Sequence, residues 1–236
     1  MRTCLGDHLG LDFPADADAL RTGGAAFLTA AFRRSGALAD DNAVATVDDL
    51  REFRGGSTGR KALLSVSYRH QCDLPRDLFV KFSRDFDDPA RDLGRSQMAF
   101  EVRFALLTRD PGFPIAVPRC LFADYHGDSG SGILITSRIA FGTNGIEAQY
   151  DKCADHAMAE PLEHYLALFS ALGRLAGTQK AGALGVASEF GVDIRRLSVG
   201  ERAPYTADQL RRRVDHLAEL TNRQPGLLPA NIAAPQ

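Results

Sequence analysis

Apolar and polar positions alternate in strand-like fashion through much of the first part of this chain, and they repeat with a helical period later. Leu64, Val66 and Tyr68 alternate with Ser65 and Ser67, which is the period-two pattern of a half-buried strand. Other strand-like segments are 44–54, 77–83, 117–125 and 133–139. Helical patterns mark 22–35, the segment around Glu101, 161–180 and 206–223. This order of elements predicts an α+β fold.

Glycine-rich turns connect neighbouring strands. Gly55-Gly56-Ser57-Thr58-Gly59 joins the first strand to the second, and residues 126–132 join the last two, so both pairs are expected to form hairpins. In the first helix, Thr22 is the expected N-terminal cap and Gly36 the expected stop. From residue 44 to about residue 139, the strands and the helix are therefore expected in the order β-β-β-α-β-β.

The pattern changes from strand-like to helical near residues 140–145. We expect an N-terminal leader and helix over 1–43, a β-rich lobe over 44–142 and a partial helical lobe over 143–236. The first residues are interpreted as a leader because they are acidic and rich in alanine and glycine.

Composition narrows the classes of function. The formal net charge of -2 favours neither nucleic acid nor an anionic membrane as a partner. No apolar run approaches the roughly 18 residues of a membrane span, and the start of the chain lacks the apolar stretch of a signal peptide. The four cysteines lack CxxC spacing, which argues against zinc and against a disulfide framework. A cytoplasmic protein is expected.

Two charged residues interrupt apolar elements. Lys81 lies in the strand segment Leu78-Phe79-Val80-Lys81-Phe82, and Glu101 lies in an apolar helix. A buried ammonium without a partner is costly, so Lys81 must reach solvent or find a carboxylate. Met98, Phe104 and Ala105 are three or four residues from Glu101, which places its carboxylate on the packed face of the helix. The two residues can therefore neutralise each other.

The turn Gly55-Gly56-Ser57-Thr58-Gly59 has the composition of a phosphate-covering loop. Small residues let backbone N–H groups approach a phosphate, and Ser57 or Thr58 adds a hydroxyl group. An ordinary hairpin turn has the same composition. A Walker A loop is excluded, because that motif requires Gly-Lys-Ser/Thr before a helix, whereas Arg60-Lys61 follows here and opens a strand.

The order and spacing of these features resemble the N-terminal lobe of the kinase-like phosphotransferases, the superfamily of aminoglycoside phosphotransferases, choline kinases and ecdysteroid kinase-like proteins. Val80-Lys81 matches their phosphate-gripping lysine strand, and Phe100-Glu101-Val102 matches their helix glutamate. The likeness extends from about residue 27 to residue 142 and is weaker over 161–180. It implies a protein-kinase-like fold, with a five-stranded antiparallel N-lobe that contains one helix and a helical C-lobe.

The resemblance also implies ATP-dependent phosphoryl transfer to a small-molecule hydroxyl group. Lys81 is then expected to clamp the α- and β-phosphates, Glu101 to orient Lys81, and Gly55 to Gly59 to cover the phosphates. Backbone groups near Ser137 to Ile139 are expected to meet adenine. ATP and Mg²⁺ are the implied cofactors, although the ligands that the family uses for Mg²⁺ are not found in this chain.

The chain departs from the family in its catalytic loop, His-Gly-Asp-x-x-x-x-Asn. Its one His-Gly-Asp, at His126-Gly127-Asp128, lies in a predicted hairpin turn, and Ile133 stands where the asparagine belongs. We therefore interpret this triplet as a polar turn. The catalytic aspartate is expected to be absent, and the chain to be a truncated or incomplete relative that is inactive alone.

Two further expectations follow from this interpretation. The alternative function is a non-catalytic, pseudokinase-like module that binds a nucleotide or a partner without turnover. An incomplete helical lobe should also expose the apolar face of segment 161–180, where Leu166 and Phe169 lie, and this predicts self-association.

Overall fold

The computed structural model describes residues 2–53, 59–86, 88, 95–151, 154, 157–184 and 206–223. The chain divides into two compact units, residues 1–190 and 191–236. Every strand of the described residues lies in the first unit.

The first unit is built on a five-stranded antiparallel sheet. Its strands follow the order β3, β4, β5, β7, β6 across the sheet. Their bounds are β3 (Val44–Phe53), β4 (Lys61–Tyr68), β5 (Asp77–Phe82), β6 (Cys120–His126) and β7 (Ser131–Ser137). Helix α2 (Arg95–Leu107) comes between β5 and β6 in the chain. The α+β class and the order β-β-β-α-β-β are confirmed.

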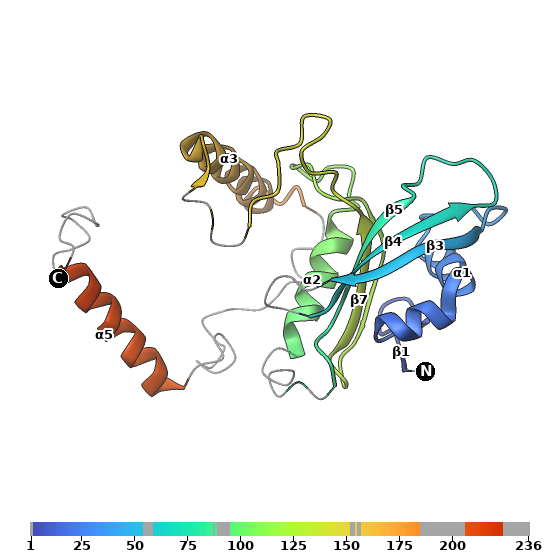
Figure 1. Ribbon diagram of the computed structural model, residues 1–236, viewed down its shortest axis with the longest axis horizontal. Helices are drawn as coiled ribbons and strands as arrows, with labels where there is room; N and C mark the ends of the chain where they lie inside the picture. The colour runs from blue at the N-terminus through green and yellow to red at the C-terminus, as the bar shows by residue number, and fades with distance from the viewer. Residues whose placement is uncertain are drawn as a thin grey trace. The chain divides into compact units, whose positions relative to one another are not determined.

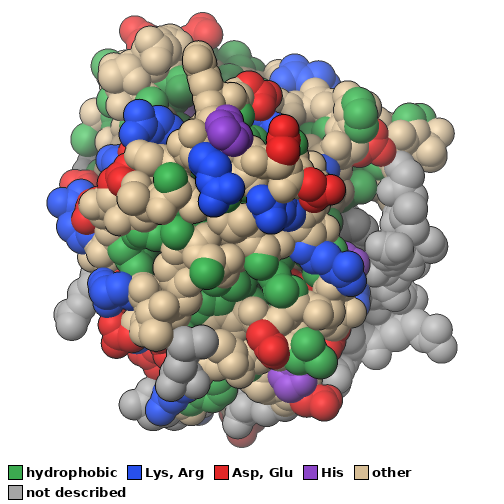
Figure 2. All heavy atoms as spheres, turned by 90° about the vertical axis from the view of Figure 1, so that its right-hand side faces the viewer, with side chains coloured by type: hydrophobic (Ala, Val, Ile, Leu, Met, Phe, Trp, Pro, Cys, Tyr) green, Lys and Arg blue, Asp and Glu red, His purple; other side chains and the backbone are tan. Residues whose placement is uncertain are grey.

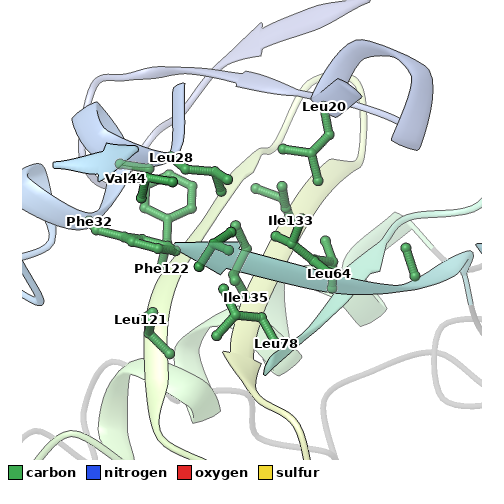
Figure 3. Packing of buried hydrophobic residues seen from close by; sticks show 14 of the residues in the cluster. Leu20, Leu28, Phe32, Val44, Leu64, Leu78, Leu121, Phe122, Ile133 and Ile135 are labelled. Atoms are coloured by element: carbon green, nitrogen blue, oxygen red, sulfur yellow. The ribbon is translucent and has the colours of Figure 1, made fainter. Parts of the chain in front are cut away.

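The main core lies between one face of this sheet and helix α1 (Ala17–Arg34). In Figure 3, Leu20, Leu28 and Phe32 of α1 lie close to Phe122 and Ile133 of the sheet. Alternate residues of the strands point into this core because successive side chains of a strand face opposite sides. The fully or almost fully buried strand residues include Ala62, Leu64, Val66, Leu78, Val80, Phe82, Ile133 and Ile135.

Helix α1 begins earlier than the sequence pattern predicts. Asp16 is its N-terminal cap and accepts a hydrogen bond from the backbone N–H of Ala19 at 2.8 Å, so the expected cap, Thr22, lies inside the helix. Gly24 adopts a φ of 51° and kinks the helix. The apolar residues before the kink therefore do not continue the helical period of those after it, and the prediction included only the later part. The expected stop is confirmed, because Gly36 follows the helix with a φ of 71°.

The segment interpreted as a leader instead forms a small antiparallel sheet of β1 (Thr3–Leu5) and β2 (Asp12–Pro14). Phe13 of β2 is fully buried in the main core. Asp124 of β6 is also fully buried, and its carboxylate accepts hydrogen bonds from the N–H groups of His8 at 3.0 Å and Leu9 at 2.9 Å. The N-terminal segment is therefore part of the packed unit.

Helix α2 covers the opposite face of the sheet from α1 (Figure 1). Its residues Met98, Val102 and Ala105 are buried against Cys120 and Ala123 of β6. The helix therefore covers the β6–β7 side of this face, and the β3–β4 side carries half-buried residues of the strands.

Two helices follow the sheet, α3 (Pro161–Lys180) and α5 (Ala207–Arg223). Within the part of the chain that the structure describes, α3 buries none of its residues, and Leu162, Leu166 and Phe169 are exposed. The expected apolar face is therefore present on α3. None of the described helices combines the length and the apolar character needed to cross a membrane.

Charged side chains of both signs are interspersed on the face of the molecule that lies to the right in Figure 1. Figure 2 shows this face, with Lys and Arg side chains among Asp and Glu side chains. This distribution agrees with the nearly balanced net charge of -2.

Candidate functional site

Lys81 and Glu101 form an ion pair on the α2 face of the sheet. The Lys81 Nζ donates a hydrogen bond to Glu101 Oε2. The Lys81 side chain is 13% exposed and the Glu101 side chain is 33% exposed. This pairing of the two interrupting charges is confirmed. A pair that is only partly open to water is stronger than a surface pair, because the surroundings screen it less.

The packing of α2 holds Glu101 in reach of the strand lysine. Met98 and Ala105, three residues before and four residues after Glu101, are buried against the sheet and anchor this side of the helix. Phe104, expected on the same packed side, is 39% exposed and contacts Phe113 edge to face. Glu101 therefore lies at the margin of the packed face, where one carboxylate oxygen meets Lys81 and the rest stays near solvent.

Lys61 is a second lysine at this site, and the sequence interpretation did not assign it a role. It is the register partner of Lys81 across β4 and β5, so both side chains leave the same face of the sheet. The Lys61 Nζ also donates a hydrogen bond to the backbone oxygen of Gly59 at 3.0 Å. Because Lys61 alternates with the buried residues Ala62 and Leu64, the sequence indicates that its side chain leaves the face of the strand opposite to the core. Its position opposite Lys81 depends on the strand register, which the sequence does not specify.

The electrostatic environment of Lys61 is unfavourable to its charge. Burial lowers the pKa of Lys61 below its ordinary 10.5, and the ammonium of Lys81 and the guanidinium of Arg84 lower it further, while Glu101 opposes them. Arg84 forms an ion pair with Asp88 at 2.9 Å. Lys61 therefore lies near two other cationic side chains, Lys81 and Arg84, each of which is paired with a carboxylate of its own.

The lowered pKa of Lys61 predicts a pH-dependent stability. Because unfolded Lys61 binds its proton more tightly, its charge opposes folding near neutral pH, and this penalty fades as the pH rises toward 10.5. Replacing Lys61 by Met should therefore raise the free energy of unfolding at neutral pH, and the advantage over wild type should shrink toward pH 10.5. Urea unfolding of both proteins at several pH values between 7 and about 10.5 measures this difference. A constant difference would contradict the prediction.

The expected phosphate-covering loop lies mostly outside the described residues, which omit Gly55, Gly56, Ser57 and Thr58. Gly59 is described and adopts a φ of 66°. A Cβ atom on Gly59 would lie 2.0 Å from the backbone oxygen of Phe82, the residue after Lys81. The end of the loop therefore lies so close to β5, the strand of Lys81, that only a residue without a side chain fits there.

The segment expected to meet adenine lies at the end of β7. The N–H of Ser137 donates to the Arg119 oxygen at 2.9 Å, and the N–H of Arg138 donates to the Asp77 oxygen at 3.0 Å. Ile139 follows the strand and is 38% exposed. Because the first two N–H groups are used within the fold, the backbone donor to adenine in this segment is expected to be the N–H of Ile139.

Apolar side chains lie beside the lysines on the same face of the sheet. Phe79 of β5, two residues before Lys81, contacts Phe53 of β3 with ring centroids 6.1 Å apart. Leu63 is the register partner of Phe79 and also lies on this face. The face thus combines cationic groups with an adjacent apolar surface, which suits a ligand with one anionic and one flat apolar end.

The triplet His126-Gly127-Asp128 lies at the β6–β7 turn, as the sequence pattern predicted. The His126 Nδ1 and the Ser129 hydroxyl are 2.9 Å apart, and the Gly127 N–H donates to the Asp7 carboxylate at 2.8 Å. The turn therefore helps to hold the N-terminal segment. Among the described residues, no group of three or more His, Cys, Asp or Glu side chains is arranged to hold a metal ion.

Comparisons of the chain with protein-family models, curated proteins and solved structures gave no significant match.

Proposed function

We propose that residues 44–142 form the nucleotide-binding lobe of a kinase-like phosphotransferase, with Lys81 as its phosphate-gripping lysine and Glu101 as the residue that positions it. The observation that carries the proposal is the Lys81–Glu101 ion pair. A lysine on the third strand of the sheet, held by a glutamate of the helix that follows, is the arrangement that kinases use to grip nucleotide phosphates.

The chemistry of the pair supports binding of phosphate. Glu101 uses one oxygen for Lys81 and so helps to fix the direction of its ammonium, a group with three N–H donors of the kind that binds phosphate oxygens. Hydrogen bonds between an ammonium and a phosphate are stronger than neutral ones. The close approach of Gly59 to Phe82 brings the end of the glycine-rich loop to the same place.

The apolar surface beside the lysines supports binding of a base. Phe79 and Leu63 lie on the same face as Lys81, so a nucleotide with its phosphates at Lys81 can lay its base over them. The backbone of Ser137 to Ile139 is the expected polar contact for adenine, with the N–H of Ile139 as its donor. Thus the described residues can bind both ends of ATP.

The family implied by the resemblance transfers phosphate from ATP to a small-molecule hydroxyl group, with Mg²⁺ neutralising the phosphates when it is bound. The residues that we assign here bind and orient the nucleotide. A binding module without turnover is the second candidate function, and the position of His126-Gly127-Asp128 in a turn that holds the N-terminal segment favours it.

Calorimetric titration with ATP, with and without Mg²⁺, tests the proposal. Replacing Lys81 by Met should weaken ATP binding about 10- to 100-fold, because one or more charge-assisted hydrogen bonds are lost. Lys180→Met is the matched control, since Lys180 is exposed at the end of α3, and its affinity should equal that of wild type. Thermal unfolding checks that each variant is folded. ATP binding that is absent, or unaffected by Lys81→Met, would reject the proposal.

Turnover assays separate the two candidate functions. ATP-dependent phosphorylation of any hydroxyl compound that Lys81→Met abolishes would establish a transferase. Lys81-dependent binding without such turnover would support the module that only binds.

A further inference from the structure

We propose that the outer edge of β3 is a contact surface for a second copy of this chain, with the two β3 strands pairing antiparallel about Leu50. β3 is an edge strand that pairs with β4 on one side, and within the part of the chain that the structure describes no strand pairs with its other side. The backbone groups of such an open edge can pair with a further strand. The proposal concerns assembly and does not rest on the proposed nucleotide function.

The hydrogen bonds between β4 and its other neighbour identify the backbone groups that β4 turns toward β3. Arg60 and Phe82 exchange two backbone hydrogen bonds, at 3.2 and 2.9 Å. The N–H of Val66 donates to the Arg76 oxygen at 2.9 Å. Because backbone groups alternate between the two neighbours of a strand, the even-numbered residues from 60 to 66 face β5 and the odd-numbered ones face β3.

This alternation leaves the backbone of Leu50 on the open edge. Leu63 of β4 lies opposite Arg51, so Arg51 bonds to β4 and the N–H and C=O groups of Leu50 point outward. The Leu50 oxygen accepts a hydrogen bond from the Arg21 guanidinium at 3.3 Å, and a carbonyl oxygen can accept a second one. Two copies of Leu50 can therefore exchange a pair of backbone hydrogen bonds.

The residues on either side of Leu50 carry opposite charges. Asp49 and Arg51 are exposed, and neither forms an ion pair with another described residue. Leu50 packs against the main core, so both charged side chains leave from the opposite face of the strand. When two copies pair about Leu50, Asp49 of each copy lies directly opposite Arg51 of the other. The contact then contains two ion pairs between opposite charges, which favour strand pairing.

The same charges disfavour the other registers in which outward backbone groups meet. An axis at Asp49, Arg51 or Glu52 would place two identical charges opposite each other, and like charges in this position destabilise a sheet. Charged side chains on an edge strand ordinarily prevent pairing. On β3 they permit one arrangement, and the partner that supplies its complement is another copy of β3.

The other charges of β3 have partners within the chain. Asp48 accepts a hydrogen bond from the Ser67 hydroxyl at 2.6 Å, and Glu52 forms an ion pair with Arg60 at 2.6 Å. A register irregularity includes Asp48, and its side chain lies on the face of Ser67, whereas Glu52, two residues after Leu50, leaves from the core side. These carboxylates therefore do not face each other between the two copies.

Charge reversal on β3, followed by sedimentation equilibrium, tests the proposal. Wild type should form a dimer whose population rises with concentration. Asp49→Arg and Arg51→Asp each turn both attractive pairs into repulsive ones, so each variant alone should dimerise about 10-fold or more weakly than wild type. An equimolar mixture of the two variants should form a mixed dimer, because each chain supplies the charge that the other lacks. The double variant should dimerise as wild type does.

Control variants separate this contact from other routes of association. Asp41→Arg and Arg69→Asp reverse exposed charges outside β3 and should leave dimerisation unchanged. Leu166→Glu alters the exposed apolar face of α3 and should also leave it unchanged. Thermal unfolding checks that each variant is folded, and if a single variant is not, the double variant decides. A wild type that stays monomeric at about 100 μM, a mixture and a double variant that do not recover the dimer, or association that only Leu166→Glu removes would overturn the proposal.

Discussion

Replacing Asp124 by Ala is expected to lower the free energy of unfolding by about 3 kcal/mol. The carboxylate is fully buried and accepts hydrogen bonds from the backbone N–H groups of His8, Leu9 and Tyr125, at 3.0, 2.9 and 2.8 Å. Removing it leaves these donors without their acceptor, and each such donor costs about 1–3 kcal/mol unless water replaces the lost group. Urea unfolding measures the loss.

Two comparison variants make the Asp124 result specific. In Asp124→Asn the loss should be smaller, because one oxygen can keep the bonds to His8 and Tyr125 while the amide group opposes Leu9. Asp41→Ala removes an exposed carboxylate and should change stability by less than about 0.5 kcal/mol. If Asp124→Ala were as stable as wild type, the N-terminal segment would not depend on this carboxylate.

Replacing Gly59 by Ala is expected to lower the free energy of unfolding by about 3 kcal/mol or more, and to weaken the proposed nucleotide binding as well. The residue has a φ of 66°, and its new Cβ atom would lie 2.0 Å from the Phe82 oxygen, so the backbone must move. Phe82 follows Lys81 directly and exchanges backbone hydrogen bonds with Arg60 at 2.9 and 3.2 Å. A shift here therefore disturbs both the pairing of β4 with β5 and the position of the lysines.

Gly10 offers a matched control for Gly59. It has a φ of 63°, and a Cβ atom added to it would meet no atom of the surrounding fold within 4 Å, so Gly10→Ala isolates the backbone penalty of about 1 kcal/mol. The excess loss in Gly59→Ala then measures the close approach of the loop to Phe82. Equal losses in the two variants, read from urea unfolding, would show that this approach is not tight.

The pairing of Lys81 with Glu101 was predictable because both charges interrupt apolar runs, and burial of a charge requires a partner. Lys61 was not predictable in the same way. It begins a strand after a glycine-rich turn, where a lysine is common. Only the strand register, which places Lys61 opposite Lys81, indicates that it belongs to the candidate site. Asp124 was missed for a similar reason, since its partners His8 and Leu9 are more than 100 residues away in the chain.

The sequence by itself determined the succession of strands and helices and the two charged residues that had to find each other, because period, turn composition and the cost of buried charge are local properties. Only the tertiary structure decided that the first residues pack into the core, that α1 and α2 lie on opposite faces of the sheet, and that Lys61 stands beside Lys81. These depend on contacts between distant segments, whose register and packing no local pattern specifies.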